Sequence, residues 1–382
     1  KTANKNSSSK EVPCMIYLSI FSVAILCTAL AEWADHKKMV TFSLMLSICA
    51  ILVLAILGGL RDKTIGTDVL YYVKGNYDLA VRSTAFTKYC ASVYAKEPLY
   101  LLCVYIVAKI FENFQVLLFI FQLITVGCVY CALWRMRDSV SPWFALLVYC
   151  ALYYNDSFNM VRQHMAMAIV LLGSTFIVEE KYKKSIFCTI IATLIHFPAA
   201  ISLLNICLYG YLQKKKVKKN VSIRELALFV VAIVGVLGVK TWSQVLIKFG
   251  LLSSRYLYYF SHESTSGHYL DTLIYLIEIC YLIANSKMLS KRMKNYNFYK
   301  LIALFNVIFL QLALFMNYGH RISLYFGIVN VMTIGQIPKT IYKASNRMIT
   351  YLIVVVIALS YWLRIYYFGG VSNTIPYIFY NR

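Results

Sequence analysis

The feature that most constrains this chain is a series of apolar runs that recur along nearly its whole length. Most runs have about the 20 residues that a helix needs to cross a hydrocarbon core of about 30 Å. A membrane β-barrel would instead show strands of about 10 residues with alternating polarity. Charged residues make up 14% of the chain, against about 25% in a typical soluble domain. The sequence therefore predicts an all-α polytopic membrane protein.

The apolar runs divide the chain into three predicted parts. Residues 1–13 are polar and expected to be disordered, residues 14–364 should form one transmembrane helical domain, and residues 365–382 form an aromatic tail. We expect a bundle of about 12–14 transmembrane helices, at about 20 residues each, with polar loops on the outer face. The expected spans lie near residues 14–30, 39–60, 114–133, 142–154, 161–178, 185–197, 199–213, 225–242, 270–286, 299–317, 322–337 and 347–364.

Positive charge is concentrated in short loops between the apolar runs. The formal net charge is +22, which in a soluble protein would suggest nucleic acid. In a membrane protein, Lys and Arg in short loops mark the cytoplasmic side, so we expect no nucleic-acid partner. The remaining charge is expected to meet anionic lipid or a phosphate-bearing substrate. The predicted cytoplasmic loops are 134–137, 179–184, 214–219, 287–294 and 339–347. The outer face then receives residues 155–162, the His196 turn, residues 243–269, residues 319–321 and the tail.

Residues 61–96 form a polar and aromatic segment that can be placed on either side. Its six basic and three acidic residues lean toward the cytoplasm, in which case the following run, 97–111, is a span. That run is short and begins with Glu97 and Pro98, which suits an interfacial helix better. We prefer the second interpretation, because residues 61–96 then share the outer face with the other polar segments.

Cysteines and glycines give no sign of a metal or nucleotide site. The 11 cysteines are scattered singly, mostly inside apolar runs, with no CxxC-type set beside histidine. Buried cysteine behaves as a small hydrophobe. No Gly-rich phosphate loop follows a strand, and the sequence contains no soluble domain to hold a nucleotide-sugar. We expect no metal and no cofactor, and an activated substrate should arrive through the lipid.

Arginines at the ends of apolar runs are the first candidates for chemistry. Charged residues at membrane depth usually face the bundle interior or a water-filled cavity. Arg162, with Gln163 and His164, opens a helix whose positive N-terminal end and planar guanidinium both favour an anion such as phosphate. A snorkelling arginine is the structural alternative. Arg321 follows His320 in a tight turn between two runs, for which a plain polar turn is the alternative.

Two further groups lie at predicted span ends. Arg61, Asp68 and Tyr71 follow the second run, where the arginine could meet phosphate and the aspartate a sugar hydroxyl. The alternative is a span end followed by a capped interfacial helix. His196 ends a short run that Pro198 breaks, and broken helices at membrane depth are tolerated where they line a cavity. The alternative is a histidine bonded to a neighbouring carbonyl.

The remaining polar residues have weaker signals. Glu278 lies in the middle of a predicted span and needs a partner such as an arginine, either to join helices or to act as a base. His262 and His268 lie in a loop rich in Ser and Tyr and are assigned to solvated loop structure. The 32 tyrosines gather in loops and at span ends, as aromatic belts do, with stacking on sugar rings as a second use.

A series of short motifs runs along the chain, and their order and spacing are more specific than any one of them. The motifs are Gly59-Leu60-Arg61, Ile65-Gly66-Thr67-Asp68 with Tyr71 and Tyr72, Glu97-Pro98, Asn159-Met160-Val161-Arg162-Gln163 with Ala166 and Ala168, Glu180-Lys181-Tyr182-Lys183-Lys184, Ala192, His196-Phe197, and Arg321 with Tyr325-Phe326. In these motifs the chain resembles the EpsG family, a branch of the Wzy-type polysaccharide polymerases. The resemblance covers roughly residues 40–335. It departs after His196, where Phe197-Pro198-Ala199-Ala200 stands in place of the family's more frequent Ser-Ala pair.

The resemblance implies a GT-C-like membrane glycosyltransferase that works without a metal. Such proteins join oligosaccharide repeat units carried on undecaprenyl diphosphate into an O-antigen, capsule or exopolysaccharide. The reaction takes place at the outer face of the bacterial cytoplasmic (inner) membrane, so the active site should face the outside or periplasm. The expected partners are lipid-linked donor and acceptor glycans and membrane lipid, with a chain-length regulator as a candidate.

The roles can be assigned as a hypothesis. Arg162 and Arg321, and then Arg61, neutralise the lipid diphosphate that leaves, as positioned cations do for a developing charge. His196 or Asp68 accepts the proton of the attacking hydroxyl. The expected substrate-binding residues are Gln163, His164, Tyr71, His320 and Glu278.

Three other functions fit parts of the pattern. A transferase resembling O-antigen ligase would pass a finished glycan to a different acceptor. A flippase for lipid-linked oligosaccharide would spread its charges along many spans and form no bond. A membrane acyltransferase usually needs a deep histidine with an Asn or Asp partner, and arginines at outer helix ends favour diphosphate over thioester chemistry.

Overall fold

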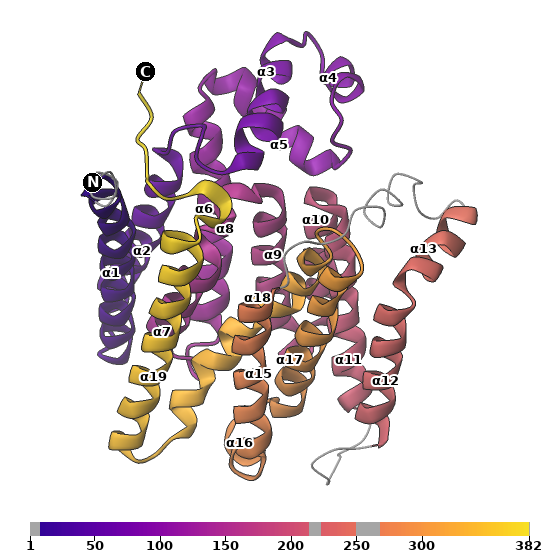
Figure 1. Cartoon of the computed structure of the whole chain (residues 1–382). Coiled ribbons are helices and arrows are strands. Elements are labelled where there is room, and N and C mark those ends of the chain that lie inside the picture. Colours follow the sequence, from indigo (N-terminus) through magenta and orange to yellow (C-terminus); the bar gives the residue numbers. More distant parts are fainter. Residues whose placement is uncertain (1–7, 214–222, 250–267, 382) are drawn as a thin grey trace, which may run out of the picture. The chain divides into compact units, whose positions relative to one another are not determined.

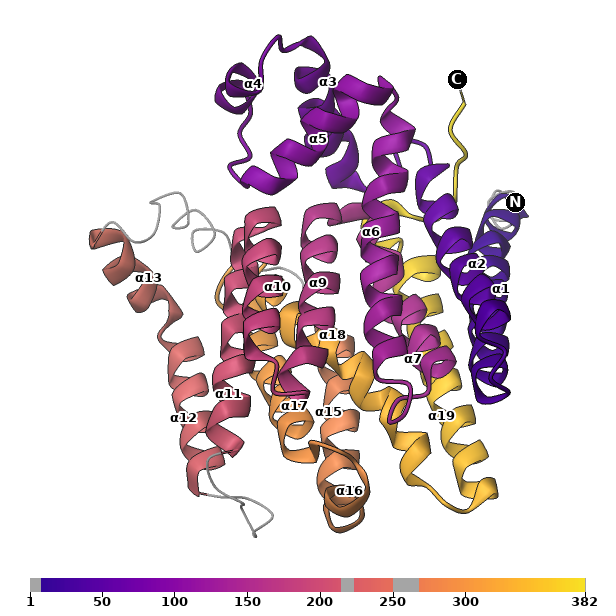
Figure 2. The same cartoon turned by 180° about the vertical axis from the view of Figure 1, so that it is seen from behind.

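The computed structural model is built from helices in two units, each with its own internal packing (Figures 1 and 2). The described residues are 8–213, 223–249 and 268–381. Unit 1 contains residues 1–176, 183–200 and 335–382, and unit 2 contains residues 177–182 and 201–334. The only β-pairing among the described residues is an isolated bridge between Arg61 and Phe379. The predicted all-α polytopic architecture is confirmed.

Unit 1 holds the longest apolar helices. Its helices are α1 (Ser8–His36), α2 (Val40–Gly59), the π-turn η1 (Val69–Val73), α3 (Lys74–Arg82), α4 (Phe86–Ser92), α5 (Pro98–Phe111), α6 (Phe114–Arg135), α7 (Pro142–Tyr149), the π-turn η2 (Cys150–Tyr154), α8 (Asp156–Asn159), α9 (Val161–Val178, whose end enters unit 2), α10 (Tyr182–Ile195), η3 (Phe197–Ser202), η6 (Ile337–Thr340), α19 (Ala344–Trp362), η7 (Leu363–Phe368) and η8 (Val371–Asn373).

A glycine pair sets the packing of α2 against α6. A Cβ atom added to Gly58 would lie 2.3 Å from the side chain of Gln122, and one added to Gly59 would lie 2.7 Å from Phe119. Any larger residue would therefore push the two helices apart, because helix cores leave few voids. The pair fixes the C-terminal end of α2 beside the first turns of α6.

The chain between α2 and α6 leaves and returns at the same end of unit 1. The Gln115 side-chain amide, at the start of α6, donates to the Arg61 carbonyl just after α2, at 2.6 Å. In Figures 1 and 2, α3, α4 and α5 lie together beyond the end of α6. Helix α5 therefore does not run from one end of unit 1 to the other. This agrees with the interfacial interpretation of residues 97–111.

Local sequence explains where α5 begins and ends. Pro98 occupies the first turn, where its missing N–H costs no hydrogen bond, and Glu97 precedes it with extended backbone. Glu112 has a left-handed backbone and stops the helix. Asn113 then caps α6 by accepting the backbone N–H of Gln115 at 2.8 Å. Two helices of different direction thus meet within three residues.

The tail, residues 365–382, pairs with the chain just after α2. The Asp62 N–H donates to the Ile378 carbonyl at 2.8 Å, and the Tyr380 N–H donates to the Leu60 carbonyl at 2.9 Å. The Tyr377 hydroxyl donates to the Leu57 carbonyl at 2.6 Å, which satisfies a carbonyl of the last turn of α2. The tail therefore packs as part of unit 1.

The tail also holds the short segment between η2 and α9. Asn155 is fully buried; its side-chain oxygen accepts the Trp362 indole N–H at 2.8 Å, and its amide donates to the Thr374 hydroxyl at 3.0 Å. The Ser372 hydroxyl donates to Asp156 at 2.8 Å. We call the end of unit 1 that carries Arg61, residues 155–162 and the tail the Arg61 end.

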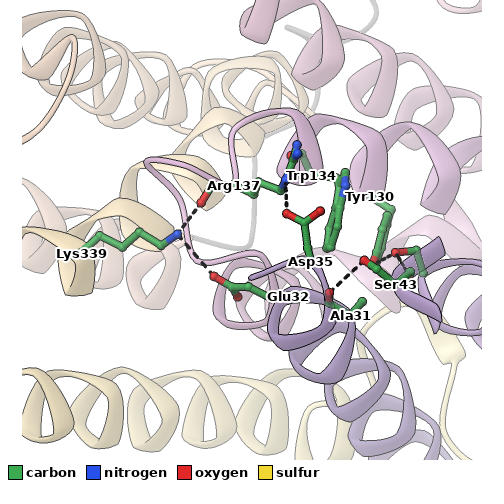
Figure 3. A network of polar contacts seen from close by, with 9 residues as sticks. Ala31, Glu32, Asp35, Ser43, Tyr130, Trp134, Arg137 and Lys339 are labelled. Atoms are coloured by element: carbon green, nitrogen blue, oxygen red, sulfur yellow. Dashed lines mark hydrogen bonds and ion pairs between the residues drawn. The ribbon is translucent and has the colours of Figure 1, made fainter. Parts of the chain in front are cut away.

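A polar network closes the opposite end of unit 1, which we call the Arg137 end (Figure 3). Arg137 donates to Asp35 at 2.8 Å, and Lys339 lies 3.3 Å from Glu32 and also donates to the Arg137 carbonyl. The Arg137 guanidinium lies 5.4 Å from the Trp134 ring. The network joins the end of α1, the turn after α6 and η6, so the basic segments 134–137 and 339–347 share one end, as predicted.

Unit 2 contains a second group of helices. They are α11 (Leu203–Gln213), α12 (Ile223–Leu237), α13 (Val239–Lys248), α15 (Tyr269–Ala284), α16 (Ser286–Arg292), α17 (Tyr296–Leu310), η5 (Gln311–Leu314) and α18 (His320–Gln336, whose end enters unit 1). The Tyr296 hydroxyl donates to the Leu282 carbonyl at 2.8 Å, which fixes α17 as it turns back along α15. Residue Asn295 makes this turn with a left-handed backbone.

Fewer helices are long enough to cross a membrane than the 12 to 14 expected. Among the described residues, six meet the length and apolarity of a span, or up to eight if each of two bent pairs counts as one. Several expected spans are shorter or interrupted: residues 142–154 pass into a π-turn, 199–213 start with a 3-10 turn, and 225–242 bend by 72° near Gly238. Apolar composition alone does not reveal such breaks.

One expectation about the N-terminus also changes. Residues 8–13, expected to be disordered with the rest of 1–13, belong to α1, while residues 1–7 lie outside the described part. The predicted loop 214–219 and His262 also lie outside the described residues.

Candidate functional site

The loop after α2 is fixed against the segment that precedes α9. Gly66 has φ +86°, and its Cα approaches the chain so closely that an added Cβ would lie 2.4 Å from the Phe158 carbonyl oxygen. Only glycine adopts this conformation without strain. The Asn159 side-chain oxygen accepts the Thr67 hydroxyl at 3.1 Å and the Asp68 N–H at 2.8 Å. Residues 61–68 and 155–162 therefore lie at the same end of unit 1.

Arg162 carries the most site-like geometry in unit 1. It is the second residue of α9, and its Nη1 lies 2.9 Å from Oε2 of Glu97. Its guanidinium also lies 5.2 Å from the Tyr100 ring centroid. The Arg162 side chain is 28% exposed, against 12% for Glu97. The guanidinium is thus held in place on one side and open on another, as a residue that binds an anion requires.

Glu97 is a site residue that sequence reasoning did not assign. It ends the extended segment before α5, and its Oε2 also accepts the Lys96 N–H at 3.1 Å. The available signal was its position directly before Pro98, at the start of a short apolar run. A carboxylate in that place has no role in starting the helix through its side chain, since it forms no capping bond. Its partner is Arg162, 65 residues away.

Arg61 was expected to bind phosphate, but its side chain is buried inside unit 1. The residue is 1% exposed, and its guanidinium donates to the carbonyls of Gly58 at 3.0 Å and Phe158 at 3.4 Å. It also lies 4.2 Å from the Phe158 ring centroid. Burial lowers the pKa of Arg61 to about 10, so the side chain stays charged at neutral pH. In this conformation Arg61 joins the end of α2 to α8.

The neighbours of Arg162 in α9 are buried. Gln163 and His164 are each 2% exposed, and the His164 ring lies 6.5 Å from that of Tyr153. Asp68 is half-buried and Tyr71 is 76% exposed. Of the residues expected to contact sugar in unit 1, Tyr71 is therefore the one presented at a surface.

His196 returns to the level of Arg162 within unit 1. Helix α10 runs back along α9 after a turn at Glu180, and Gly173 packs against Cys188, with an added Cβ 3.1 Å from the Cys188 Cβ. His164 precedes Gly173 by nine residues and His196 follows Cys188 by eight. At about 1.5 Å per residue, both positions lie about 12–14 Å along the pair toward the Arg61 end.

The other predicted site residues belong to unit 2. His320 and Arg321 begin α18, and the Arg321 guanidinium lies 4.5 Å from the Tyr318 ring centroid. Glu278 is buried in the middle of α15, and neither of its carboxylate oxygens has a hydrogen-bond partner within the described part of the chain. The expected ion pair between Glu278 and an arginine is not found there. The predicted residues thus form one group in unit 1 and one in unit 2.

A family model described as the EpsG family matches residues 44–379, which is most of the chain and includes both groups of site residues. No curated protein and no solved structure matches.

Proposed function

We propose, from the premise that this chain belongs to the EpsG family, that it is a polymerase for lipid-linked oligosaccharides. Membership in the family indicates a polysaccharide polymerase of the glycosyltransferase type. The finer proposal is that it joins undecaprenyl-diphosphate-linked repeat units into a surface polysaccharide. The site would act at the outer face of the cytoplasmic membrane and without a metal.

The observation that carries the proposal is the ion pair between Arg162 and Glu97. The leaving group of the reaction is a lipid diphosphate, an anion that a guanidinium can hold with two parallel hydrogen bonds. Glu97 and Tyr100 fix the Arg162 side chain before substrate arrives, so little is lost in ordering it. The first turn of α9 adds N–H groups and the positive end of the helix dipole.

A diphosphate would compete with Glu97 for the same guanidinium. Because the Glu97–Arg162 bond uses Nη1, the remaining donors of the Arg162 fork can meet the diphosphate first. Arg61 supports this arrangement as a positioning residue, since it ties the loop after α2 to Phe158, four residues before Arg162.

The test is polymerisation by purified protein of lipid-linked repeat units extracted from cells that lack a polymerase. We expect a ladder of products on a gel with the native chain, at least about a hundredfold less product with Arg162→Gln, and an intermediate loss with Arg162→Lys, which keeps charge without the planar fork. Glu97→Gln should lower the rate while the protein stays folded, because glutamine keeps the shape of the side chain and an oxygen that can still accept a hydrogen bond from Arg162. The matched control is Arg82→Gln, which removes an exposed arginine from α3.

The outcomes separate the rival functions. A product transferred to a different acceptor, with no ladder, would indicate a ligase-like transferase. Movement of lipid-linked glycan across vesicles without a new bond would indicate a flippase. A native ladder with Arg162→Gln would refute the role given to Arg162.

A further inference from the structure

Two cationic side chains meet one aromatic ring at the Arg137 end of unit 1. The guanidinium of Arg135, the last residue of α6, lies 4.3 Å from the centroid of the Phe176 ring, and its Nε donates to the Thr175 hydroxyl at 3.0 Å. The ammonium nitrogen of Lys184, in the first turn of α10, lies 5.8 Å from the same ring centroid. Because Phe176 lies near the end of α9, the ends of three helices contribute to this cluster.

The packing of α9 on α10 explains why Lys184 reaches this ring. Gly173 of α9 lies against Cys188 of α10, so closely that an added Cβ would lie 3.1 Å from the Cys188 Cβ. Phe176 follows Gly173 by three residues, and Lys184 precedes Cys188 by four. Each therefore lies about one helical turn from the contact, toward the same end of the helix pair.

The charge and exposure of the cluster favour an anion. Arg135 and Lys184 are exposed, and Phe176 is half-buried. Two like charges beside one ring repel each other, and an anion that contacts both removes this repulsion. The segment 179–184 has three lysines and two glutamates, and one of these, Glu179, pairs with Lys181 at 2.7 Å. The positive groups thus outnumber the carboxylates around this turn.

An exposed apolar face of α10 begins directly beside the two cations. With 3.6 residues per turn, four apolar side chains fall within about 100° of one another around the helix. They are 37–63% exposed and comprise Ile186, Phe187, Ile190 and Leu194. Lys183, which is also exposed, lies on this face one turn before the first of them. An apolar face with cations at one end matches a lipid that has acyl chains and an anionic headgroup.

We infer that Arg135 and Lys184 bind the headgroup phosphate of an anionic phospholipid whose acyl chains lie along the exposed face of α10. The guanidinium can donate to phosphate oxygens through its planar fork, and the ammonium adds a point charge on the other arm of the cluster. The ligand is a bilayer lipid and not a free phosphate, because the cations stand where the apolar face begins. This site lies apart from Arg162 and does not depend on the proposed polymerase function.

The experiment measures lipid binding to the purified, delipidated full chain in neutral detergent by native mass spectrometry. The probes are phosphatidylglycerol, the zwitterionic phosphatidylcholine, and glycerol 3-phosphate, which has an anionic phosphate without acyl chains. We expect phosphatidylglycerol to bind at least about tenfold more tightly than either other probe, since two cations and an apolar face act together. Lys184→Gln and Arg135→Gln should each raise its Kd about fivefold. Phe187→Ala, which shortens the apolar face, should raise it about threefold.

The matched control is Lys343→Gln, which removes an exposed lysine just before α19 at the same end of unit 1. Its Kd for phosphatidylglycerol should equal that of the native chain. The melting temperature without added lipid checks that each variant is folded, and if Arg135→Gln does not fold, Lys184→Gln decides alone.

Three results would contradict the inference. If Lys343→Gln weakens binding as much as Lys184→Gln, the attraction is spread over the surface and no site exists at Phe176. If phosphatidylcholine binds as tightly as phosphatidylglycerol, the cations do not select the headgroup. If glycerol 3-phosphate binds as tightly as the lipid, the apolar face of α10 contributes nothing. None of these results changes the product ladder by which the polymerase function is tested.

Discussion

Replacing Gly66 by alanine tests whether the loop after α2 positions the Arg162 site. Gly66 has φ +86°, a left-handed conformation that costs an L-residue about 1–2 kcal/mol. The new Cβ would also lie 2.4 Å from the Phe158 carbonyl oxygen and 3.0 Å from the Asn159 Cα. These are backbone atoms that cannot rotate away, and relieving such overpacking typically costs about 1–3 kcal/mol. The sum is a destabilisation of about 2–5 kcal/mol.

The displacement matters for activity as well as stability. Moving Phe158 or Asn159 weakens the bonds that hold Thr67 and Asp68, and Arg162 follows Asn159 by three residues. We expect Gly66→Ala to lower the apparent melting temperature in detergent by about 4–10 °C, at about 2 °C per kcal/mol, and to reduce polymer formation in the fraction that remains folded.

Gly75→Ala is the matched control for this prediction. Gly75 lies in α3, in the same segment, and an added Cβ there meets no atom within 4 Å. Alanine in a helix is more favourable than glycine by about 0.5–1 kcal/mol, so this variant should equal or exceed the native protein in stability. The reasoning is refuted if Gly66→Ala and Gly75→Ala have the same melting temperature and the same activity.

Two more predictions concern buried polar groups. Asn155→Leu removes the side chain that bonds the Trp362 N–H and the Thr374 hydroxyl, and each buried group left in this way costs about 1–3 kcal/mol. The half-life of this variant at a fixed temperature in detergent should therefore shorten markedly. An unchanged half-life would show that these tail contacts do not stabilise unit 1. For His320, the folded pKa of about 3 lies below the ordinary 6.5, so the unfolded chain binds the proton first and stability is lost as pH falls below 6.5. At pH 5 the loss is about 2 kcal/mol. His320→Gln should therefore lose less stability than the native chain between pH 7 and pH 5, and equal losses would count against the buried, neutral state of His320.

The sequence identified the architecture and one end of unit 1 correctly because those depend on composition. Basic residues predicted that loops 134–137 and 339–347 share an end, and the Arg137–Lys339 network bears this out. For residues 61–96, the excess of basic over acidic residues favoured the cytoplasmic side, where the other basic loops were expected. The short run after Glu97 was the better guide, because a helix too short to cross returns the chain to the end where it left.

The environment of each candidate residue was harder to predict. The residue type of Arg61 suggests phosphate, but its burial depends on Phe158 and on the tail bridge at Phe379, which are distant in the sequence. The sequence predicted that His268 is a solvated loop residue, but its ring packs against that of His320 at the start of α18. Motif positions therefore predicted candidate residues, while the contacts of those residues depend on packing between segments far apart in the chain.

The bridge between Arg61 and Phe379 has a consequence for how the protein is made. A ribosome adds residues in order, and the Tyr377 hydroxyl that closes on the Leu57 carbonyl is synthesised 320 positions after it. Helices α1, α2 and α6 are inserted long before that residue exists. A truncation that stops before Tyr377 would thus leave the apolar helices complete but open beside Arg61, and quality-control proteases would meet the nascent protein in that state.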